Sequence, residues 1–165
     1  MKQKNGIIYD GKTKTLKEKT KSEKLDFSVP KRKIDSISIE FQTPTRIVQQ
    51  GEVVRNPEFR KIVPNLLRRI YLLSYFHCNE TFNIDFSNLL KKATTIKTKL
   101  EFFKFQHWER YSGRQKKSVP MDGFIGTVIY EGDLSPFYPY LKAGEVLHIG
   151  KNTAFGMGKY RIMQY

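Results

Sequence analysis

A glycine-rich segment near the end of the sequence combines a permissive backbone with positive charge. Residues 150–159 read GKNTAFGMGK, so three glycines fall within nine positions and a lysine lies near each end. Glycine lets a backbone approach a phosphate closely and present its N–H groups to it. A glycine-rich turn between two edge strands is the alternative interpretation. The candidate phosphate contacts, from the loop 150–158 and the lysine after it, are Gly150, Lys151, Asn152, Gly156, Gly158 and Lys159.

A second basic segment, residues 108–117, mixes positive charge with aromatic rings. Such a mixture suits RNA, because the charges bind the phosphate backbone and the rings stack on bases. The alternative is an ordinary basic loop in which the tryptophan completes a core. The candidate RNA-binding residues here are Trp108, Arg110, Tyr111, Arg114, Lys116 and Lys117.

Histidine is the natural general acid or base near neutral pH, and the chain has three. His148 is nearest to the glycine-rich loop and is the catalytic candidate, although its expected strand position suits a core histidine equally well. His77 fits a charge at a helix C-terminus, and His107 fits a core position.

The spacing of the glycines and histidines disfavours several classes of cofactor. The loop has neither the Gly-Lys-Ser/Thr of a P-loop nor the glycine order of a dinucleotide fingerprint, which disfavours nucleoside triphosphates. The histidines match no metal-binding spacing, and the single cysteine, Cys78, allows no intrachain disulfide. We therefore expect no metal ion and no other cofactor.

Composition narrows the class of partner. The 165 residues contain 30 Lys+Arg against 16 Asp+Glu, a formal net charge of +14, which favours a polyanion such as nucleic acid. Hydrophobic residues make up 39% and aromatic residues 13%, enough for a folded core. No apolar run approaches the ~18 residues that span a bilayer, and no signal peptide is evident. We expect a soluble, cytoplasmic protein without membrane contact.

The charge is concentrated at the start of the chain. Residues 1–33 hold 11 Lys+Arg against 4 Asp+Glu, so one fifth of the sequence carries half of the net charge. This region predicts a Lys-rich N-terminal arm or hairpin, with a strand at Ile7–Tyr9 and a tight turn at Asp10-Gly11. The domain that follows is expected to cover residues 34–165.

The hydrophobic pattern from Ile34 onward predicts an α+β domain in the order strand, helix, strand, strand, helix, strand. Pro44 is expected to end the first strand, and Pro64 to kink the first helix or to separate a short first turn from it. A shift of the apolar residues between Phe102 and Phe103 predicts a β-bulge. The expected strands are 34–41, 96–111, 123–130, 145–150 and 159–165, and the expected helices are 56–77, 85–93 and 133–141.

This order is that of the split βαβ, ferredoxin-like fold, with a four-stranded antiparallel sheet on two helices. One face of the sheet is then left open, as in RNA-recognition modules. In the first helix, Arg68 and Arg69 lie at the edge of the apolar face. An ion pair of Arg68 with Glu101 or Asp133 is one interpretation that the sequence leaves open.

Four motifs in order resemble the C-terminal domain of the CRISPR-associated endoribonucleases that process repeat RNA, within the RAMP superfamily. The glycine-rich run is the most specific of them, and together they span about residues 39–161. The motifs are FQTPTR at 41–46, LRRI at 67–70, RYSGRQ at 110–115 before GFIG at 123–126, and the run from 146 to 160.

The resemblance implies a ferredoxin-like RAMP fold and binding of CRISPR repeat RNA, with Arg46 of the first motif among the contacts. It also implies metal-independent cleavage, in which a 2′-hydroxyl attacks the adjacent phosphate and leaves a cyclic phosphate. Members of this family have two such domains, and their usual catalytic histidine lies in the N-terminal one. Residues 1–33 are too short to be that domain. The other half is therefore expected on a separate chain, or the sequence is a fragment or a binding-only relative.

Three functions follow as hypotheses. The first is repeat-RNA binding and processing as the C-terminal half of an endoribonuclease. The second is a non-catalytic RNA-binding subunit of a CRISPR effector complex, and the third is a basic scaffold that contacts only protein. The expected partners are CRISPR repeat RNA, a separate N-terminal RAMP domain or other CRISPR-associated subunits, and a second copy of the chain in a homodimer.

Overall fold

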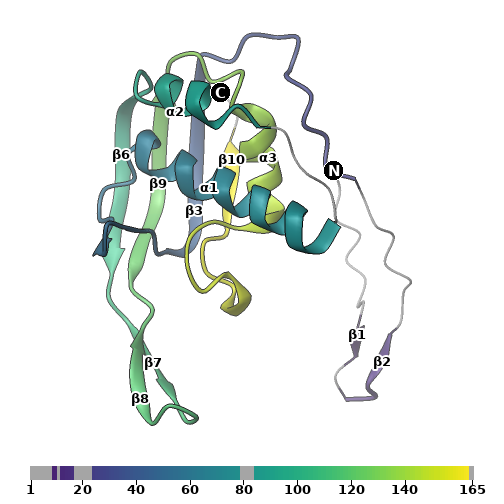
Figure 1. Ribbon diagram of the computed structural model, residues 1–165. Helices are drawn as coiled ribbons and strands as arrows, with labels where there is room; N and C mark the ends of the chain where they lie inside the picture. Colours follow the sequence, from purple (N-terminus) through teal and green to yellow (C-terminus); the bar gives the residue numbers. More distant parts are fainter. Residues whose placement is uncertain (1–8, 11, 17–23, 79–83, 164–165) are drawn as a thin grey trace.

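A four-stranded antiparallel sheet covered on one face by helices forms the domain (Figure 1). The computed structural model describes residues 9–10, 12–16, 24–78 and 84–163. The strand order β10-β3-β9-β6 and the helices between the strands confirm the predicted ferredoxin-like fold. The sheet consists of β3 (Ser36–Thr45), β6 (Lys97–Gln106), β9 (Gly123–Glu131) and β10 (Tyr160–Met163), and the helices are α1 (Phe59–Leu73), α2 (Phe86–Ala93) and α3 (Tyr138–Leu147).

The core lies between the sheet and the helices. Alternate residues of β3, Ile37, Ile39 and Phe41, are fully buried, as the period-2 pattern predicts. Phe41 meets the ring of Phe124 edge to face, with centroids 4.9 Å apart, which ties β3 to its neighbour β9. The apolar stripe of α1 packs on this layer, so the positions of α1 and β3 are fixed relative to each other.

The first helix starts later than predicted and does not break. Glu58, not Asn56, is the N-cap residue, and its carbonyl oxygen accepts a bond from the Lys61 N–H at 2.8 Å. No separate first turn forms at Pro64, because α1 runs through it as one continuous helix. Buried residues before and after Pro64, such as Ile62 and Leu66, hold both parts against the sheet. A π-helical turn, η1 (Ser74–Cys78), extends the helix through the predicted His77 end. The short helix α2 is also as predicted, with Asp85 as its cap.

The predicted strand at 145–150 is wrong. Residues 145–147 belong to α3, which continues well past the expected end at Leu141. Pro139 lies in the first turn, where a missing N–H costs little, so it does not shorten the helix. The glycine-rich loop therefore connects α3 to β10 and is not a turn between two strands. It contains a short 3₁₀ turn, η2 (Thr153–Phe155).

Two strands are irregular in ways that place the site. The first strand does not stop before Pro44 but reaches Thr45, with a register shift between Phe41 and Thr45. The bulge predicted between Phe102 and Phe103 is wrong, because the register is regular there; β6 has its irregularity between Thr98 and Leu100. After this irregularity, Phe102 pairs with Thr127 on β9. The Phe102 side chain lies on the open face of the sheet and is 71% exposed.

Three hairpins complete the chain. The predicted basic connection after β6 is a hairpin of β7 (Glu109–Ser112) and β8 (Lys117–Pro120), which projects beyond the sheet (Figure 1). A small hairpin joins β4 (Val48–Gln49) to β5 (Glu52–Val53). The N-terminal hairpin pairs β1 (Tyr9–Asp10) with β2 (Thr15–Leu16).

Parts of two predictions lie outside the described residues. They are Ile7, Ile8 and Gly11 of the N-terminal hairpin, and positions 164–165 of the last strand. Among the described residues, no helix has the length and apolar character needed to cross a membrane.

Close packing of α3 against β10 makes Gly144 sensitive to substitution. A Cβ atom at Gly144 would lie 2.0 Å from the Tyr160 hydroxyl oxygen and 2.7 Å from Leu66 Cδ1. That hydroxyl donates to the Leu141 carbonyl oxygen at 2.7 Å, and burial raises the pKa of Tyr160 well above its ordinary value. We expect Gly144→Ala to lower the free energy of unfolding by about 2 kcal/mol, measured by urea titration.

Gly113 provides the control, because a Cβ atom there would meet nothing within 4 Å. Gly113→Ala should change the free energy of unfolding by less than about 0.5 kcal/mol. Equal effects of the two substitutions would contradict the packing described for α3.

Candidate nucleic-acid interface

The glycine-rich loop is fixed to the irregular end of β3 by backbone hydrogen bonds. The Arg46 carbonyl oxygen accepts the Lys151 N–H at 2.7 Å, and the Pro44 carbonyl oxygen accepts the Gly158 N–H at 3.0 Å. Both ends of the loop thus bond to the same short segment, residues 44–46. This bonding places the loop beside β3, which the sequence motifs alone did not predict.

Thr43 adds a side-chain contact to the same attachment. Its hydroxyl donates to the Gly156 carbonyl oxygen at 2.9 Å and accepts the Lys159 N–H at 2.9 Å. Because one hydroxyl can donate and accept at once, a single side chain satisfies two backbone groups of the loop.

Two of the three loop glycines are required by close approach. A Cβ atom at Gly158 would lie 1.8 Å from the Ile149 carbonyl oxygen, and one at Gly150 would lie 2.3 Å from the Arg46 carbonyl oxygen. Both residues have positive φ, 71° and 86°. Gly156 also has positive φ, 81°, but faces open space. The glycines let the loop bond to β3 and turn back on itself, which is a structural requirement independent of any ligand.

The loop side chains are directed partly outward. Lys151 and Lys159 are exposed, and the Phe155 ring is 57% exposed. Asn152 is half-buried, with a left-handed backbone (φ 61°) and its side-chain amide 3.2 Å from the Met121 sulfur atom. Asn152 therefore attaches the loop to the base of the β7–β8 hairpin.

The hairpin meets the loop through a cation–π contact. The Arg110 guanidinium carbon lies 4.5 Å from the centroid of the Phe155 ring. Strand alternation places Lys117, through its partner Ser112, on the same hairpin face as Arg110, and Tyr111 on the other face. The structure thus brings together the two segments that the sequence singled out separately.

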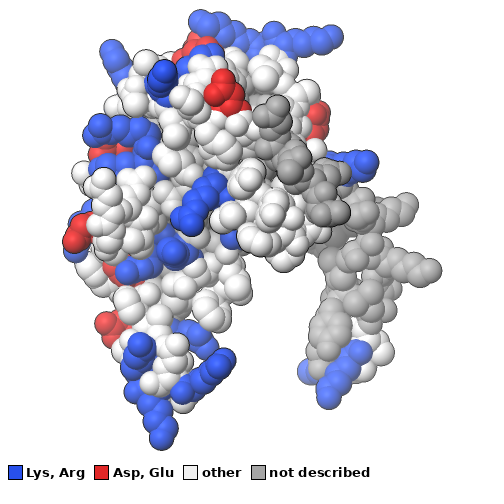
Figure 2. Space-filling model, viewed as in Figure 1, with Lys and Arg blue, Asp and Glu red and all other residues white. Residues whose placement is uncertain are grey.

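The hairpin tip carries most of its positive charge. Figure 2 shows Lys and Arg side chains gathered at the end of the hairpin. Arg114, Lys116 and Lys117 are all exposed there. Trp108, at the hairpin base, is 43% exposed and does not complete the core. The charge-plus-ring interpretation of this segment therefore fits its geometry, whereas the core alternative for the tryptophan does not.

His148 is the C-cap residue of α3. The expected strand position of His148 is therefore wrong. Its backbone has φ 60°, and its Nδ1 atom lies 3.2 Å from the Met157 carbonyl oxygen. A carbonyl oxygen only accepts, so a hydrogen bond here requires the tautomer that carries its hydrogen on Nδ1, which leaves Nε2 as the acceptor. His77 and His107 are exposed, and the expectation of a core position for His107 is wrong.

Arg46 is half-buried and forms an ion pair with Asp122, just before β9. A half-buried pair of this kind holds the end of β3 to the start of β9, next to the loop. The contact of Arg46 with RNA stays a prediction, and its position beside the loop is compatible with one.

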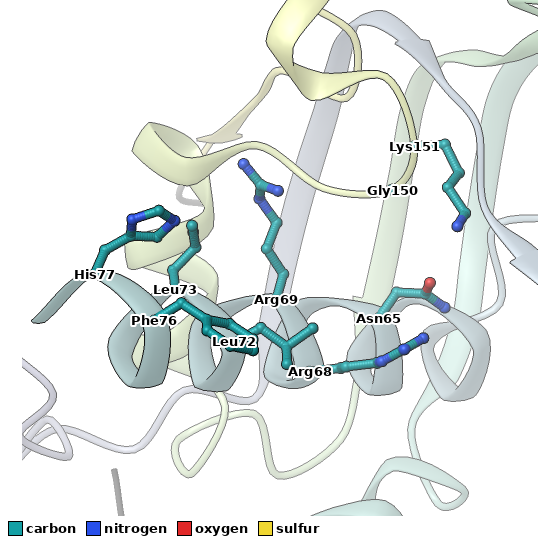
Figure 3. Close-up of a pocket in the computed structure, with 9 residues that line it drawn as sticks. All are labelled: Asn65, Arg68, Arg69, Leu72, Leu73, Phe76, His77, Gly150 and Lys151. Atoms are coloured by element: carbon teal, nitrogen blue, oxygen red, sulfur yellow. The ribbon is translucent and has the colours of Figure 1, made fainter. Parts of the chain in front are cut away.

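A cavity of about 280 Å³ between α1, η1 and the loop was missed by sequence reasoning (Figure 3). Arg68, Arg69 and Phe76 line it from the helix and Lys151 from the loop. The lining residues Asn65, Arg68, Leu72 and Phe76 follow one another at intervals of three to four positions, which was visible in the sequence. Their position opposite the loop depends on the tertiary fold. No carboxylate that the structure describes pairs with Arg68, and the Glu101 side chain lies outside the described part.

The geometry of the loop predicts different effects for two of its glycines. Gly156→Ala should cost about 1 kcal/mol of unfolding free energy from the positive φ alone. Gly158→Ala must also displace the loop from Ile149, so it should cost clearly more, by chemical denaturation. Equal costs at the two positions would contradict the close approach at Gly158.

Comparison with known proteins identifies a family and similar folds. The family model of the CRISPR-associated endoribonuclease Cas6 matches residues 39–160. No curated protein sequence matches the chain. Among solved structures, Thermus thermophilus Cas6 (TTHB231) is 16% identical with a TM-score of 0.61, over 80% of this chain and 55% of that one.

Two further structures are similar. The Cas6 (TTHA0078) product complex gives a TM-score of 0.56 at 18% identity, over 78% of this chain and 51% of that chain. A chain of a Cas6-RT-Cas1–Cas2 complex gives 0.56 at 13% identity, over 79% of this chain and 14% of that one. These identities establish likeness of fold, and the chain spans about half the length of the two Cas6 chains.

The family model covers both the β3 end and the glycine-rich loop attached to it, the two parts that form the interface. The chain therefore belongs to the Cas6 family of CRISPR-associated endoribonucleases.

Proposed function

We propose that the chain binds CRISPR repeat RNA and forms the C-terminal half of a Cas6-type endoribonuclease. The observation that carries this proposal is the joint surface of the glycine-rich loop and the β7–β8 hairpin. Family membership supports the choice of RNA as the polyanion, and solved relatives of similar fold are product and substrate-mimic complexes.

The hairpin and the loop offer complementary contacts to RNA. The hairpin tip presents exposed cations, which bind phosphates without regard to sequence. Phe155 is 57% exposed beside Arg110, so part of its ring is accessible to a base. Tyr111, on the opposite face of the hairpin, is a second ring of this kind. RNA would lie along the hairpin and reach the loop at Phe155.

For the chemistry, we propose that His148 acts as a general base or acid through Nε2. In this step the 2′-hydroxyl oxygen forms a bond to the adjacent phosphorus and loses its proton to a base, while the 5′-oxygen leaves with a proton. The products are a 2′,3′-cyclic phosphate and a free 5′-hydroxyl. A second titratable group would come from the other half of the enzyme, on a separate chain or in an N-terminal domain.

Two alternatives are kept because each predicts a different result. A non-catalytic subunit of a CRISPR effector complex would use the same surface for RNA without cleavage. A scaffold would bind other CRISPR-associated proteins, and one relative of similar fold belongs to a Cas6-RT-Cas1–Cas2 complex. A homodimer and a cytoplasmic location are further parts of the proposal.

The RNA-binding proposal predicts that the hairpin tip controls affinity. We expect the double variant Arg114→Ala/Lys117→Ala to bind radiolabelled repeat RNA about tenfold more weakly, with a smaller salt dependence, because phosphate contacts release counterions. The matched control Lys91→Ala/Lys92→Ala removes the same charge from α2 and should bind as the unchanged protein does. If the unchanged protein has no affinity for repeat RNA even at low salt, only the scaffold alternative is left.

The catalytic proposal predicts products without added metal. Repeat RNA incubated in EDTA with an enzyme that contains both halves should yield ends carrying a 2′,3′-cyclic phosphate. His148→Gln should abolish them, because an amide keeps a donor near the Met157 carbonyl but supplies no base. RNA binding without products, or full activity of His148→Gln, would remove His148 from catalysis and favour the non-catalytic subunit.

A further inference from the structure

The cavity between α1 and the glycine-rich loop holds positive charge that has no described counter-charge. Three basic side chains are half-buried among the residues that the structure describes: Arg46, Lys61 and Arg69. Arg46 pairs with Asp122 and Lys61 pairs with Glu58. Among the described residues, Arg69 bonds only to a backbone carbonyl and no carboxylate lines its cavity. A partly buried charge without a partner is unfavourable, so the site is suited to an anion.

Arg69 is held in an orientation that faces the loop. Its Nε atom donates to the Leu147 carbonyl oxygen at 2.8 Å, which fixes the guanidinium plane. Burial lowers the pKa of Arg69, so the protein environment opposes its charged form. In Figure 3 Arg69 points from the helix toward the loop, and Lys151 points from the loop back toward the helix. Both side chains line the cavity, Arg69 from the helix and Lys151 from the loop.

The attraction for an anion has to come from these side chains. The cavity lies beside the C-terminal half of α1, where the helix dipole is negative. Arg68 lies on the same wall, exposed and without a described ion pair, so it adds a third cation. Substituting the side chains is therefore a direct test of the site.

An aromatic side chain lies at the rim of the cavity. Phe76 is 70% exposed, and none of the residues of η1 is buried. A π-helical turn is rare and often marks a functional site. Here it places a ring next to cations, an arrangement that suits a base stacked beside its own phosphate.

We propose that this cavity binds a phosphodiester group of single-stranded RNA, with the adjoining base stacked on Phe76. The proposal rests on the RNA-binding function above and extends it to a second contact surface. The glycine-rich loop then lies between two RNA contacts, with Phe155 meeting the hairpin and Lys151 meeting the cavity.

The test uses the full chain and a fluorescent single-stranded RNA of about 12 nucleotides, within the length that one module binds. Arg68→Gln should weaken binding about tenfold and lower the salt slope by about 0.7, the value for one lost phosphate contact on a single strand. Phe76→Ala should also weaken binding about tenfold but leave the salt slope unchanged, because stacking releases no counterions. Both side chains are exposed, so thermal unfolding should be unaltered.

Two control variants match these changes. Arg60→Gln removes an exposed arginine of α1 outside the cavity, one that pairs with Glu58, and Phe102→Ala removes an equally exposed ring from the open face of the sheet. Both should bind as the unchanged protein does. Loss of binding on Phe102→Ala but not on Phe76→Ala would place the base on the sheet and overturn the proposal.

The remaining outcomes separate this inference from the function on which it rests. If the unchanged protein binds the RNA and the Arg68 and Phe76 variants bind equally well, the cavity is not an RNA site, while the proposed function stands. If the unchanged protein binds neither this RNA nor repeat RNA, the proposed function itself fails. Competition by millimolar inorganic phosphate together with no effect of Phe76→Ala would indicate a site for free phosphate and overturn the RNA assignment.

Discussion

The site depends on carbonyl groups that β3 does not use in its own sheet. A central strand normally bonds to a neighbour on each side, but the register shift between Phe41 and Thr45 interrupts that ladder. The Pro44 carbonyl oxygen instead accepts Gly158, and the Arg46 carbonyl oxygen accepts Lys151. Proline is tolerated here because the irregular segment does not need its missing N–H for the ladder. The fixed sheet therefore positions a loop that has almost no secondary structure of its own.

The positively charged side chains around this loop are of two kinds, paired and unpaired. Arg46, next to the loop, is neutralised by Asp122 and helps to hold the scaffold together. The exposed cations of the hairpin and those of the α1 cavity have no such described partners. Paired charge thus serves the architecture and unpaired charge is kept for a ligand, which is the pattern expected for a protein that binds a polyanion.

The sequence predicted most of the sheet and failed where tertiary contacts decide. Apolar alternation in β3 and β9 gave both strands, because their buried faces repeat every second residue. Residues 145–150 looked like a strand, yet 145–147 continue α3, in which Gly144 packs closely against Tyr160. The segments of the site were identified by residue type, but the contact of Arg110 with Phe155 and the cavity beside Arg69 join positions far apart in the chain. No local pattern encodes such pairings.

The hairpin is a direct continuation of the two strands at one edge of the sheet. β6 leads into β7 and β8 leads into β9, so the tip is carried by two strands that are anchored in the core. Residues near Gly113 are exposed, and a side chain at Gly113 would meet no other atom within 4 Å. Lengthening or shortening the tip therefore changes the reach of the protein without disturbing its core. This arrangement allows the reach of the interface to change during evolution while the sheet and the glycine-rich loop stay the same.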